Sequence, residues 1–128
     1  MEIRKDLLYS QSHEWIAKKD GIIRIGITDY AQDSLTDIVY VELPEVNKYY
    51  KKGDVIASVE SVKSVGEIYA PCDGKVIAIN DKLEDEPGLI NESPYDEGWI
   101  AEMEVENEED LEDLMDAEQY EELISKDL

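Results

Sequence analysis

The chain has 128 residues, enough for one domain and too few for two of ordinary size. With 42% hydrophobic residues it can form a packed core, which argues against wholesale disorder. Its 33 acidic and 12 basic side chains give a net charge of -21, a sign that argues against binding to nucleic acid.

The acidic residues are concentrated at the C-terminal end, where residues 101–128 hold 13 acids and one base. We therefore expect a single domain with a core over about 7–106 and an acidic helical segment over 107–128. Cys72 is the only cysteine, so no disulfide can form within the chain. No run approaches the roughly 18 apolar residues of a membrane span, and we expect a cytoplasmic protein.

Residues 13–27 predict a β-hairpin. Asp20-Gly21 is a dipeptide that favours a type I′ turn between two strands. After this turn Ile23, Ile25 and Ile27 alternate with other residues, which places them on one face of the second strand.

A short helix and a strand are expected next. Either Thr28 or Asp29 can cap a helix that continues through Leu35. The β-branched run over 38–43 then predicts a strand, which Pro44 ends.

Two glycine-led segments resemble each other in the middle of the chain. The run 53–57 returns at 74–78 with the pattern Gly-x-Val-Ile-Ala, which suggests a folded-over unit with two similar strands. The residues between them are strand-like on both sides of 61–64. We therefore expect Lys63 to lie at the tip of a hairpin.

The last third predicts a loop, a strand and two helices. Residues 81–97, rich in proline, glycine and acids, indicate a long surface loop, and 99–105 alternate as a half-buried strand. Asn107 is a candidate helix cap, and Asp116 with Gln119 forms a capping-box pattern that opens a second helix.

A lysine at a turn usually contributes only solubility, but three features of Lys63 favour a modified residue. It is the only basic residue between Lys52 and Lys75, so an enzyme would meet one amine on this protrusion. Glu60 lies three residues before it and offers an acidic handle for orientation. Paired strands would also give the tip a stiff base, which a swinging prosthetic group requires.

The pattern around Lys63 resembles the lipoylation site of the H proteins of the glycine cleavage system. Further segments resemble motifs of that family in the same order along the chain, at residues 12–15, 26–33, 37–44, 91–95, 98–99 and 116–120. The resemblance implies a mostly β, hybrid barrel-sandwich fold with short helices and a C-terminal helical segment. It also implies lipoic acid in amide linkage to Lys63, with Glu60 helping the loading enzyme to recognise that lysine.

The resemblance further implies a carrier without catalytic residues of its own. The lipoyl arm would receive an aminomethyl group from a pyridoxal-phosphate glycine decarboxylase. An aminomethyltransferase would pass the one-carbon unit to tetrahydrofolate, and dihydrolipoyl dehydrogenase would reoxidise the arm. A lipoyl ligase or transferase would load the chain, and we expect a monomer.

The family also shelters the loaded arm in a cleft beside the lysine hairpin. The positions that match this cleft are Ser12, Glu14, Ile27, Ser34 and Glu67. Two of them are carboxylates that could hold a cationic amine, and Ile27 offers apolar surface to the arm. Ser34 stands where many members have histidine, so an imidazole role does not carry over to that position.

Other interpretations of Lys63 stay open. A biotinyl carrier is disfavoured because Val62 and Ser64 stand where that class has methionines. An H-like protein could instead relay lipoyl groups to other carriers, and an acidic interaction module could leave the lysine unmodified. The sequence offers no nucleophile that His13 could activate as a general base, so we expect no catalysis by this residue. Cys72 has no cysteine or histidine at metal-ligand spacing, so we expect no metal site.

Overall fold

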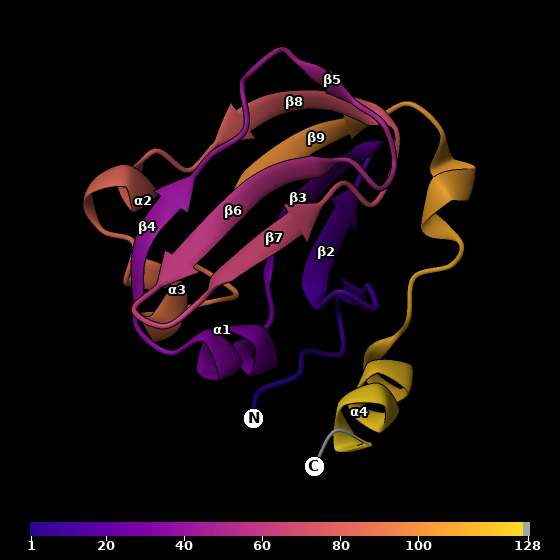
Figure 1. Cartoon of the computed structure of the whole chain (residues 1–128). Coiled ribbons are helices and arrows are strands. Elements are labelled where there is room, and N and C mark those ends of the chain that lie inside the picture. The colour runs from indigo at the N-terminus through magenta and orange to yellow at the C-terminus, as the bar shows by residue number, and fades with distance from the viewer. Residues whose placement is uncertain (127–128) are drawn as a thin grey trace.

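The computed structural model describes residues 1–126, which form two antiparallel sheets with short helices around them (Figure 1). The larger sheet has the strand order β1-β2-β3-β9-β8-β5 and the smaller one the order β4-β6-β7. The strands of the larger sheet are β1 Leu8–Tyr9, β2 Glu14–Lys19, β3 Ile22–Ile27, β5 Tyr49–Tyr50, β8 Gly74–Ile79 and β9 Ala101–Val105. Those of the smaller sheet are β4 Ile38–Glu42, β6 Val55–Ser61 and β7 Val65–Tyr69.

The β2–β3 hairpin confirms the predicted type I′ turn. Asp20 and Gly21 have φ angles of 52° and 77°, and both residues must be left-handed in that turn. Further along the hairpin, Trp15 lies opposite Gly26 in the ladder. A Cβ atom on Gly26 would approach the indole to 2.5 Å, so only glycine leaves room for the ring.

Helix α1, Asp29–Leu35, begins at Thr28, whose hydroxyl accepts a hydrogen bond from the Ala31 amide at 3.2 Å. Thr28 is therefore the cap, one of the two residues that the sequence left open. Strand β4 then confirms the strand expected before Pro44.

Buried side chains form two hydrophobic clusters. The larger cluster contains apolar residues of both sheets and of the short helices, among them Ile25, Val59, Ile68, Leu83 and Met103. The smaller one joins the N-terminal strands to the C-terminal helix and consists of Leu7, Tyr9, Trp15, Tyr95, Tyr120 and Ile124. In this smaller cluster the Tyr9 and Tyr120 rings stack, with centroids 4.6 Å apart and planes 7° apart.

The segment 81–97 differs from the expected surface loop. It contains two short helices, α2 Lys82–Asp85 and α3 Leu89–Glu92, each of which buries one side chain, Leu83 or Ile90, in the core. The proline and glycine residues correctly predicted turns in this segment, but they gave no sign that Leu83 and Ile90 are buried. Burial of about one large aliphatic side chain per turn stabilises such short helices where their own propensity would not.

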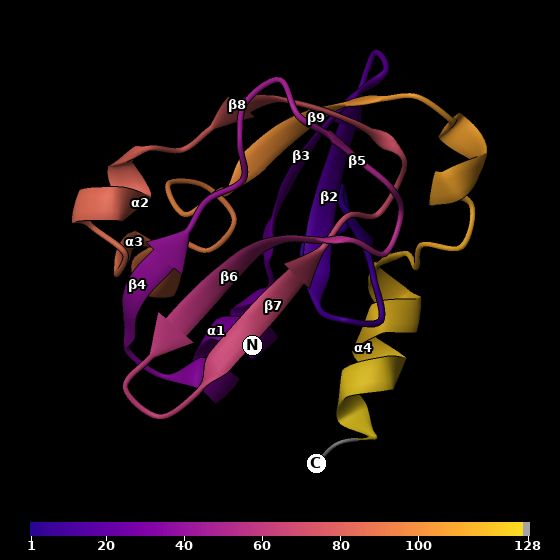
Figure 2. The same cartoon turned by 45° about the horizontal axis from the view of Figure 1, so that its top comes forward.

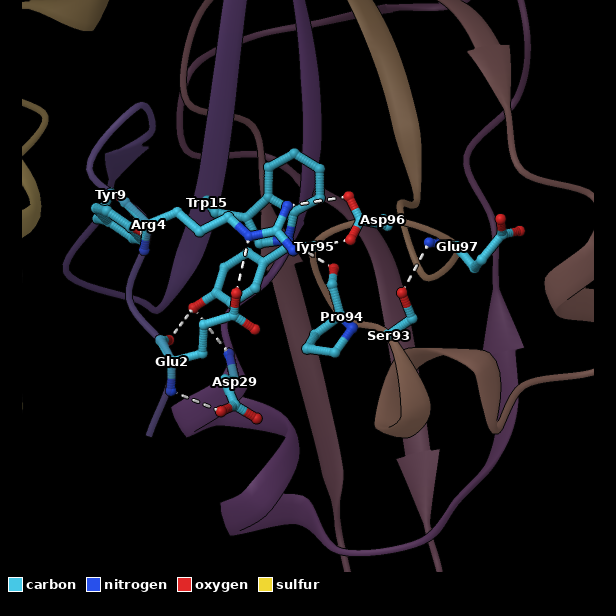
Figure 3. Close-up of polar contacts among 10 residues, drawn as sticks. All are labelled: Glu2, Arg4, Tyr9, Trp15, Asp29, Ser93, Pro94, Tyr95, Asp96 and Glu97. Carbon is cyan, nitrogen blue, oxygen red and sulfur yellow. Dashed lines mark hydrogen bonds and ion pairs between the residues drawn. The ribbon is translucent and has the colours of Figure 1, made fainter.

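The end of the same segment is tied to the N-terminus (Figure 3). The Trp15 indole donates to the Pro94 carbonyl at 2.9 Å, and the Tyr95 hydroxyl donates to the Glu2 carbonyl at 2.6 Å. The Arg4 guanidinium makes two hydrogen bonds of 2.9 and 2.8 Å to Asp96. Because Arg4 stabilises the charged carboxylate, it lowers the pKa of Asp96 below its usual value.

The C-terminal segment is helical in part. A 3₁₀ turn, Glu108–Leu111, stands where the first helix was expected, and the Asn107 side chain caps it. Helix α4, Ala117–Ser125, begins with the predicted capping box, in which Asp116 and Gln119 exchange hydrogen bonds of 2.9 Å. Within residues 1–126, no helix is long and apolar enough to span a bilayer.

The expected fold class is confirmed: a mostly β sandwich of two antiparallel sheets with short helices and a C-terminal helix. The two strands with similar sequence, β6 and β8, lie in different sheets. A glycine stands at or just before the start of each strand, and the two positions require glycine for different reasons. Gly53 has a φ of 91°, whereas a Cβ on Gly74 would lie 2.3 Å from the Glu104 carbonyl oxygen. The boundary between a core over 7–106 and a tail over 107–128 stays a prediction.

Candidate attachment site and its neighbouring pocket

Lys63 lies in the turn between β6 and β7. In Figures 1 and 2 the tip of this hairpin lies next to the segment that leads from α1 to β4. The side chain of Ser61 holds the backbone of this turn. Its hydroxyl accepts from the amides of Ser64 and Lys63 at 3.0 and 3.3 Å, and it donates to the Ser64 carbonyl at 3.1 Å. The Val62 amide also donates to the Asp37 carbonyl at 3.2 Å, which ties the tip to the chain before β4.

The side chain of Lys63, in contrast, is exposed. None of the ion pairs among residues 1–126 involves its ammonium group. Its apolar neighbours Val62 and Val65 are 69% and 61% exposed. The amine is therefore open to solvent, and no packed side chain covers it.

Glu60 lies on the exposed face of the same hairpin. It pairs with Tyr40 of β4 on one side and with Val65 of β7 on the other, so the three residues form one row across the sheet. Tyr40 is also exposed, at 53%. A partner that approaches the tip would meet one carboxylate between a tyrosine ring and a valine side chain.

A pocket of about 290 Å³ lies beside the hairpin, between α1 and β7. Its lining combines apolar side chains with hydroxyl groups and one carboxylate. The lining residues are Ser12, His13, Ile27, Tyr30, Ala31, Ser34, Leu35, Val59, Gly66, Glu67 and Ile68.

Four of the five residues proposed for an arm cleft line this pocket: Ser12, Ile27, Ser34 and Glu67. Ile27 comes from β3, Ser34 from α1 and Glu67 from β7, so three elements that are separate in sequence bring these side chains together.

Glu14, the fifth residue, does not line the pocket. Its side chain is only 1% exposed, and its carboxylate accepts hydrogen bonds from the Ser10 hydroxyl, from the Ser12 hydroxyl at 2.6 Å and from the Tyr69 amide at 3.2 Å. These bonds join the turn before β2 to the end of β7. Glu14 thus connects elements next to the pocket.

His13 and Tyr30 are pocket residues that the sequence did not assign to a cleft. The Nδ1 atom of His13 lies 2.8 Å from the hydroxyl oxygen of Tyr120, a residue of α4. No local pattern reports a contact between residues 107 positions apart. The sequence did contain one signal for the apolar side of the pocket, because the spacing of Ala31 and Leu35 places both residues on one face of α1.

Two other titratable groups are buried and stay protonated. Burial above all, together with the nearby carboxylates of Asp110 and Asp73, raises the pKa of the Cys72 thiol to about 12. Burial also raises the pKa of Tyr120, an effect that its hydrogen bond with Thr28 partly opposes. Cys72 is therefore a core residue and not a nucleophile. Over residues 1–126, no three His, Cys, Asp or Glu side chains are grouped to hold a metal ion.

The whole chain is similar to one protein family. The sequence model of the glycine cleavage H-protein matches residues 7–127. A glycine cleavage system H protein from Oceanobacillus iheyensis is 55% identical over 124 residues, which cover 97% of this chain and 98% of the relative. One from Listeria monocytogenes is 54% identical, with 97% and 99% covered.

A solved structure gives the same result. The crystal structure of a glycine cleavage system H protein from Mycobacterium marinum superposes with a TM-score of 0.89 at 33% identity. The superposition covers 96% of this chain and 99% of that protein.

Proposed function

The chain belongs to the glycine cleavage H-protein family and is a lipoyl carrier of the glycine cleavage system, and we propose that Lys63 is the residue that holds the lipoyl group. The observation that supports this assignment most strongly is the contrast at the hairpin tip. The turn's backbone is hydrogen-bonded through Ser61, whereas the side chain of Lys63 is exposed. A covalent arm requires this combination of a fixed base and a free amine.

The residues around the tip fit the lipoyl group. An amide bond needs a primary amine, and Lys63 supplies the one lysine side chain of the hairpin. The aliphatic part of an arm needs apolar surface, which Ile27, Leu35 and Ile68 provide in the adjoining pocket. Lipoylation at this position thus requires no rearrangement of the core.

The lipoyl group, once attached, supplies the dithiol chemistry that receives and passes on the one-carbon unit and the electrons. The protein supplies the tether and the shelter. Tethering makes each transfer effectively intramolecular, because the arm is held at high local concentration near every docked enzyme. The pocket between α1 and β7 is the proposed resting place of the loaded arm. There the Glu67 carboxylate would be available to the cationic amine of the loaded arm, and Ser12 and Ser34 would offer hydroxyl groups.

Partners follow from membership in a multienzyme system. We propose three that act on the arm: the pyridoxal-phosphate glycine decarboxylase, the aminomethyltransferase and dihydrolipoyl dehydrogenase. A lipoyl ligase or transferase loads Lys63, and the row formed by Tyr40, Glu60 and Val65 is the surface next to the amine that it meets. Catalytic residues belong to these enzymes, and the carrier acts as a monomer in the cytoplasm.

The test is reconstitution of the first reaction. Lipoylated chain is mixed with glycine decarboxylase and glycine, and carbon dioxide release is measured against the unlipoylated chain. We expect release that depends on the lipoylated chain. A carrier that supports no release, yet passes its lipoyl group to other lipoyl domains in the presence of a transferase, would be a lipoyl relay instead.

The resting place is tested separately with Glu67→Gln, which keeps the size and removes the charge. If the carboxylate holds the amine, release of formaldehyde from the loaded carrier becomes faster in the variant. An exposed ion pair contributes about 0.2–1 kcal/mol, so the expected acceleration is about 1.5- to 5-fold. Equal rates would remove Glu67 from the shelter and leave the attachment at Lys63 untouched.

A further inference from the structure

The turn before β2 and the C-terminal helix meet at a chain of hydrogen bonds beside the pocket. Nδ1 of His13 lies 2.8 Å from the Tyr120 hydroxyl oxygen, and this oxygen lies 2.7 Å from the Thr28 hydroxyl. Tyr120 and Thr28 are fully buried, whereas His13 lines the pocket. One side chain of α4 therefore contacts the pocket wall through a buried hydroxyl group.

The direction of these hydrogen bonds follows from the helix cap. The Thr28 hydroxyl already accepts from the Ala31 amide, so its own hydrogen is available to the Tyr120 oxygen. Tyr120 then donates its hydrogen to Nδ1 of His13. If His13 instead donated to Tyr120 and Tyr120 donated to Thr28, the hydrogen of the Thr28 hydroxyl would need another acceptor. The hydrogen bonds among residues 1–126 contain no such acceptor. Nδ1 thus accepts, and an uncharged ring carries its hydrogen on Nε2.

The backbone of His13 is fixed as well. Its φ angle is 69°, in the left-handed region that few residues other than glycine adopt. The His13 amide donates to the Ser10 carbonyl at 3.2 Å, and the His13 carbonyl accepts from the Thr28 amide at 3.1 Å. The ring also contacts Tyr30 of α1, with centroids 5.0 Å apart. Its position is therefore set from three elements.

We propose that helix α4 completes the arm pocket: Tyr120 fixes His13 as an uncharged Nε2–H ring in the wall, where it does not repel the cationic amine of the loaded arm. Tyr120 is a positioning residue in this account. The titratable side chains around the same space are Tyr30 from α1, Tyr120 from α4, Glu67 from β7 and the buried Glu14, whose carboxylate is held by Ser10 and Ser12. Among the described residues that line the pocket itself, a neutral histidine leaves Glu67 as the charged group. The inference rests on the proposed function.

His13 is the only histidine of the chain, which makes a direct measurement possible. In protein labelled with ¹⁵N-histidine, two-dimensional ¹⁵N–¹H spectra of one imidazole report which nitrogen carries hydrogen. We expect hydrogen on Nε2 and an Nδ1 resonance typical of a hydrogen-bond acceptor. In Tyr120→Phe this Nδ1 resonance moves, whereas in Tyr9→Phe it does not. Hydrogen on Nδ1 in the unaltered protein, or an Nδ1 signal that ignores Tyr120→Phe, overturns the proposal.

Tyr9→Phe is a matched control, because Tyr9 stacks on Tyr120 but its hydroxyl bonds to the backbone of Arg4. Both variants keep the stacked rings and lose one buried hydroxyl. For the loaded carrier we expect formaldehyde release to rise about 2- to 10-fold in Tyr120→Phe, as loss of one hydrogen bond implies, and to stay unchanged in Tyr9→Phe.

Equal acceleration in both variants would show a general loss of packing and would contradict a role for the Tyr120 hydroxyl. The spectra are recorded on unlipoylated protein, so they test the wall independently of Lys63. If the lipoylated chain accepts no one-carbon unit, the proposed function fails before release is measured, and the two failures are distinct.

Discussion

Two turns lie beside the pocket, and their serine hydroxyls hold different groups in place. In the turn before β2, the hydroxyls of Ser10 and Ser12 donate to Glu14, whose buried side chain is held in place. In the β6–β7 turn the hydroxyl of Ser61 bonds only to the backbone of the turn, and the side chain of Lys63 is exposed. The Ser10 hydroxyl also accepts from the Glu14 amide at 3.0 Å, so the serines of the first turn fix a side chain together with main chain. The serine of the second turn fixes main chain only.

This difference matches what a carrier requires of each place. A group that visits several enzymes needs a mobile side chain on a stiff base. A shelter between visits needs walls that stay in one arrangement. Substitutions in or beside each turn would therefore remove this difference or measure its size.

The largest effect is expected for Lys63→Arg. A guanidinium keeps the positive charge but is far too basic to be acylated by a loading enzyme. Because the side chain is exposed, the free energy of unfolding should change by less than about 0.5 kcal/mol, while lipoylation is lost completely. Intact mass after co-expression with a loading enzyme measures the lipoylation, and thermal unfolding measures the change in stability. Residual lipoyl mass in this variant would show a second attachment site.

Glu14→Ala should mainly affect stability. The change leaves the Tyr69 amide and two serine hydroxyls without their acceptor in a buried place, and the expected loss is about 2–3 kcal/mol of unfolding free energy. Urea denaturation measures it. Glu67→Ala, at an exposed carboxylate, should cost no more than about 0.5 kcal/mol. Similar losses in the two variants would contradict the fixed first turn.

Ser61→Ala tests the second turn. The alanine removes the acceptor for the Ser64 and Lys63 amides near the surface, so a loss of about 1 kcal/mol is expected together with slower lipoylation. Ser64→Ala is the control, because the Ser64 hydroxyl makes none of the hydrogen bonds found among residues 1–126. If both variants are loaded at the rate of the unaltered chain, backbone fixation does not matter for recognition.

The smallest effect is expected for Glu60→Ala. Its carboxylate is exposed, and one such charge contributes about 0.2–1 kcal/mol to an encounter with the loading enzyme. Loading should become about 1.5- to 5-fold slower at low salt, and the difference should shrink as salt screens the charge. Time courses of loading at two ionic strengths measure this. A rate that is independent of Glu60 at low salt would make it a solubilising residue only.

Local sequence signals predicted the elements that have their own start or stop. The Asp20-Gly21 turn, the Thr28 cap and the capping box at Asp116 all depend on residues within four positions of one another, and the structure confirms each. The tip position of Lys63 followed from the two strands beside it. The likeness to a known family added the fold class and the carrier function.

Features that depend on contacts between distant segments could not be predicted from the sequence. The two-residue strands β1 and β5 are too short to show a period, and they form because a longer strand pairs with each. Helices α2 and α3 depend on single buried anchors, Leu83 and Ile90. The position of Glu14 outside the pocket and the contact of His13 with Tyr120 result from the packing of distant segments, which no local pattern records.

The most direct test of the central claim is mass mapping of the peptide that spans residues 53–75. Protein from cells that supply lipoate and a loading enzyme is digested, and fragment ions are used to locate any added mass. The account predicts one lipoyl group, attached to Nζ of Lys63, and unmodified lysines elsewhere in the chain. A lipoyl group on another lysine, or an unmodified Lys63 in protein that supports glycine decarboxylation, would contradict it.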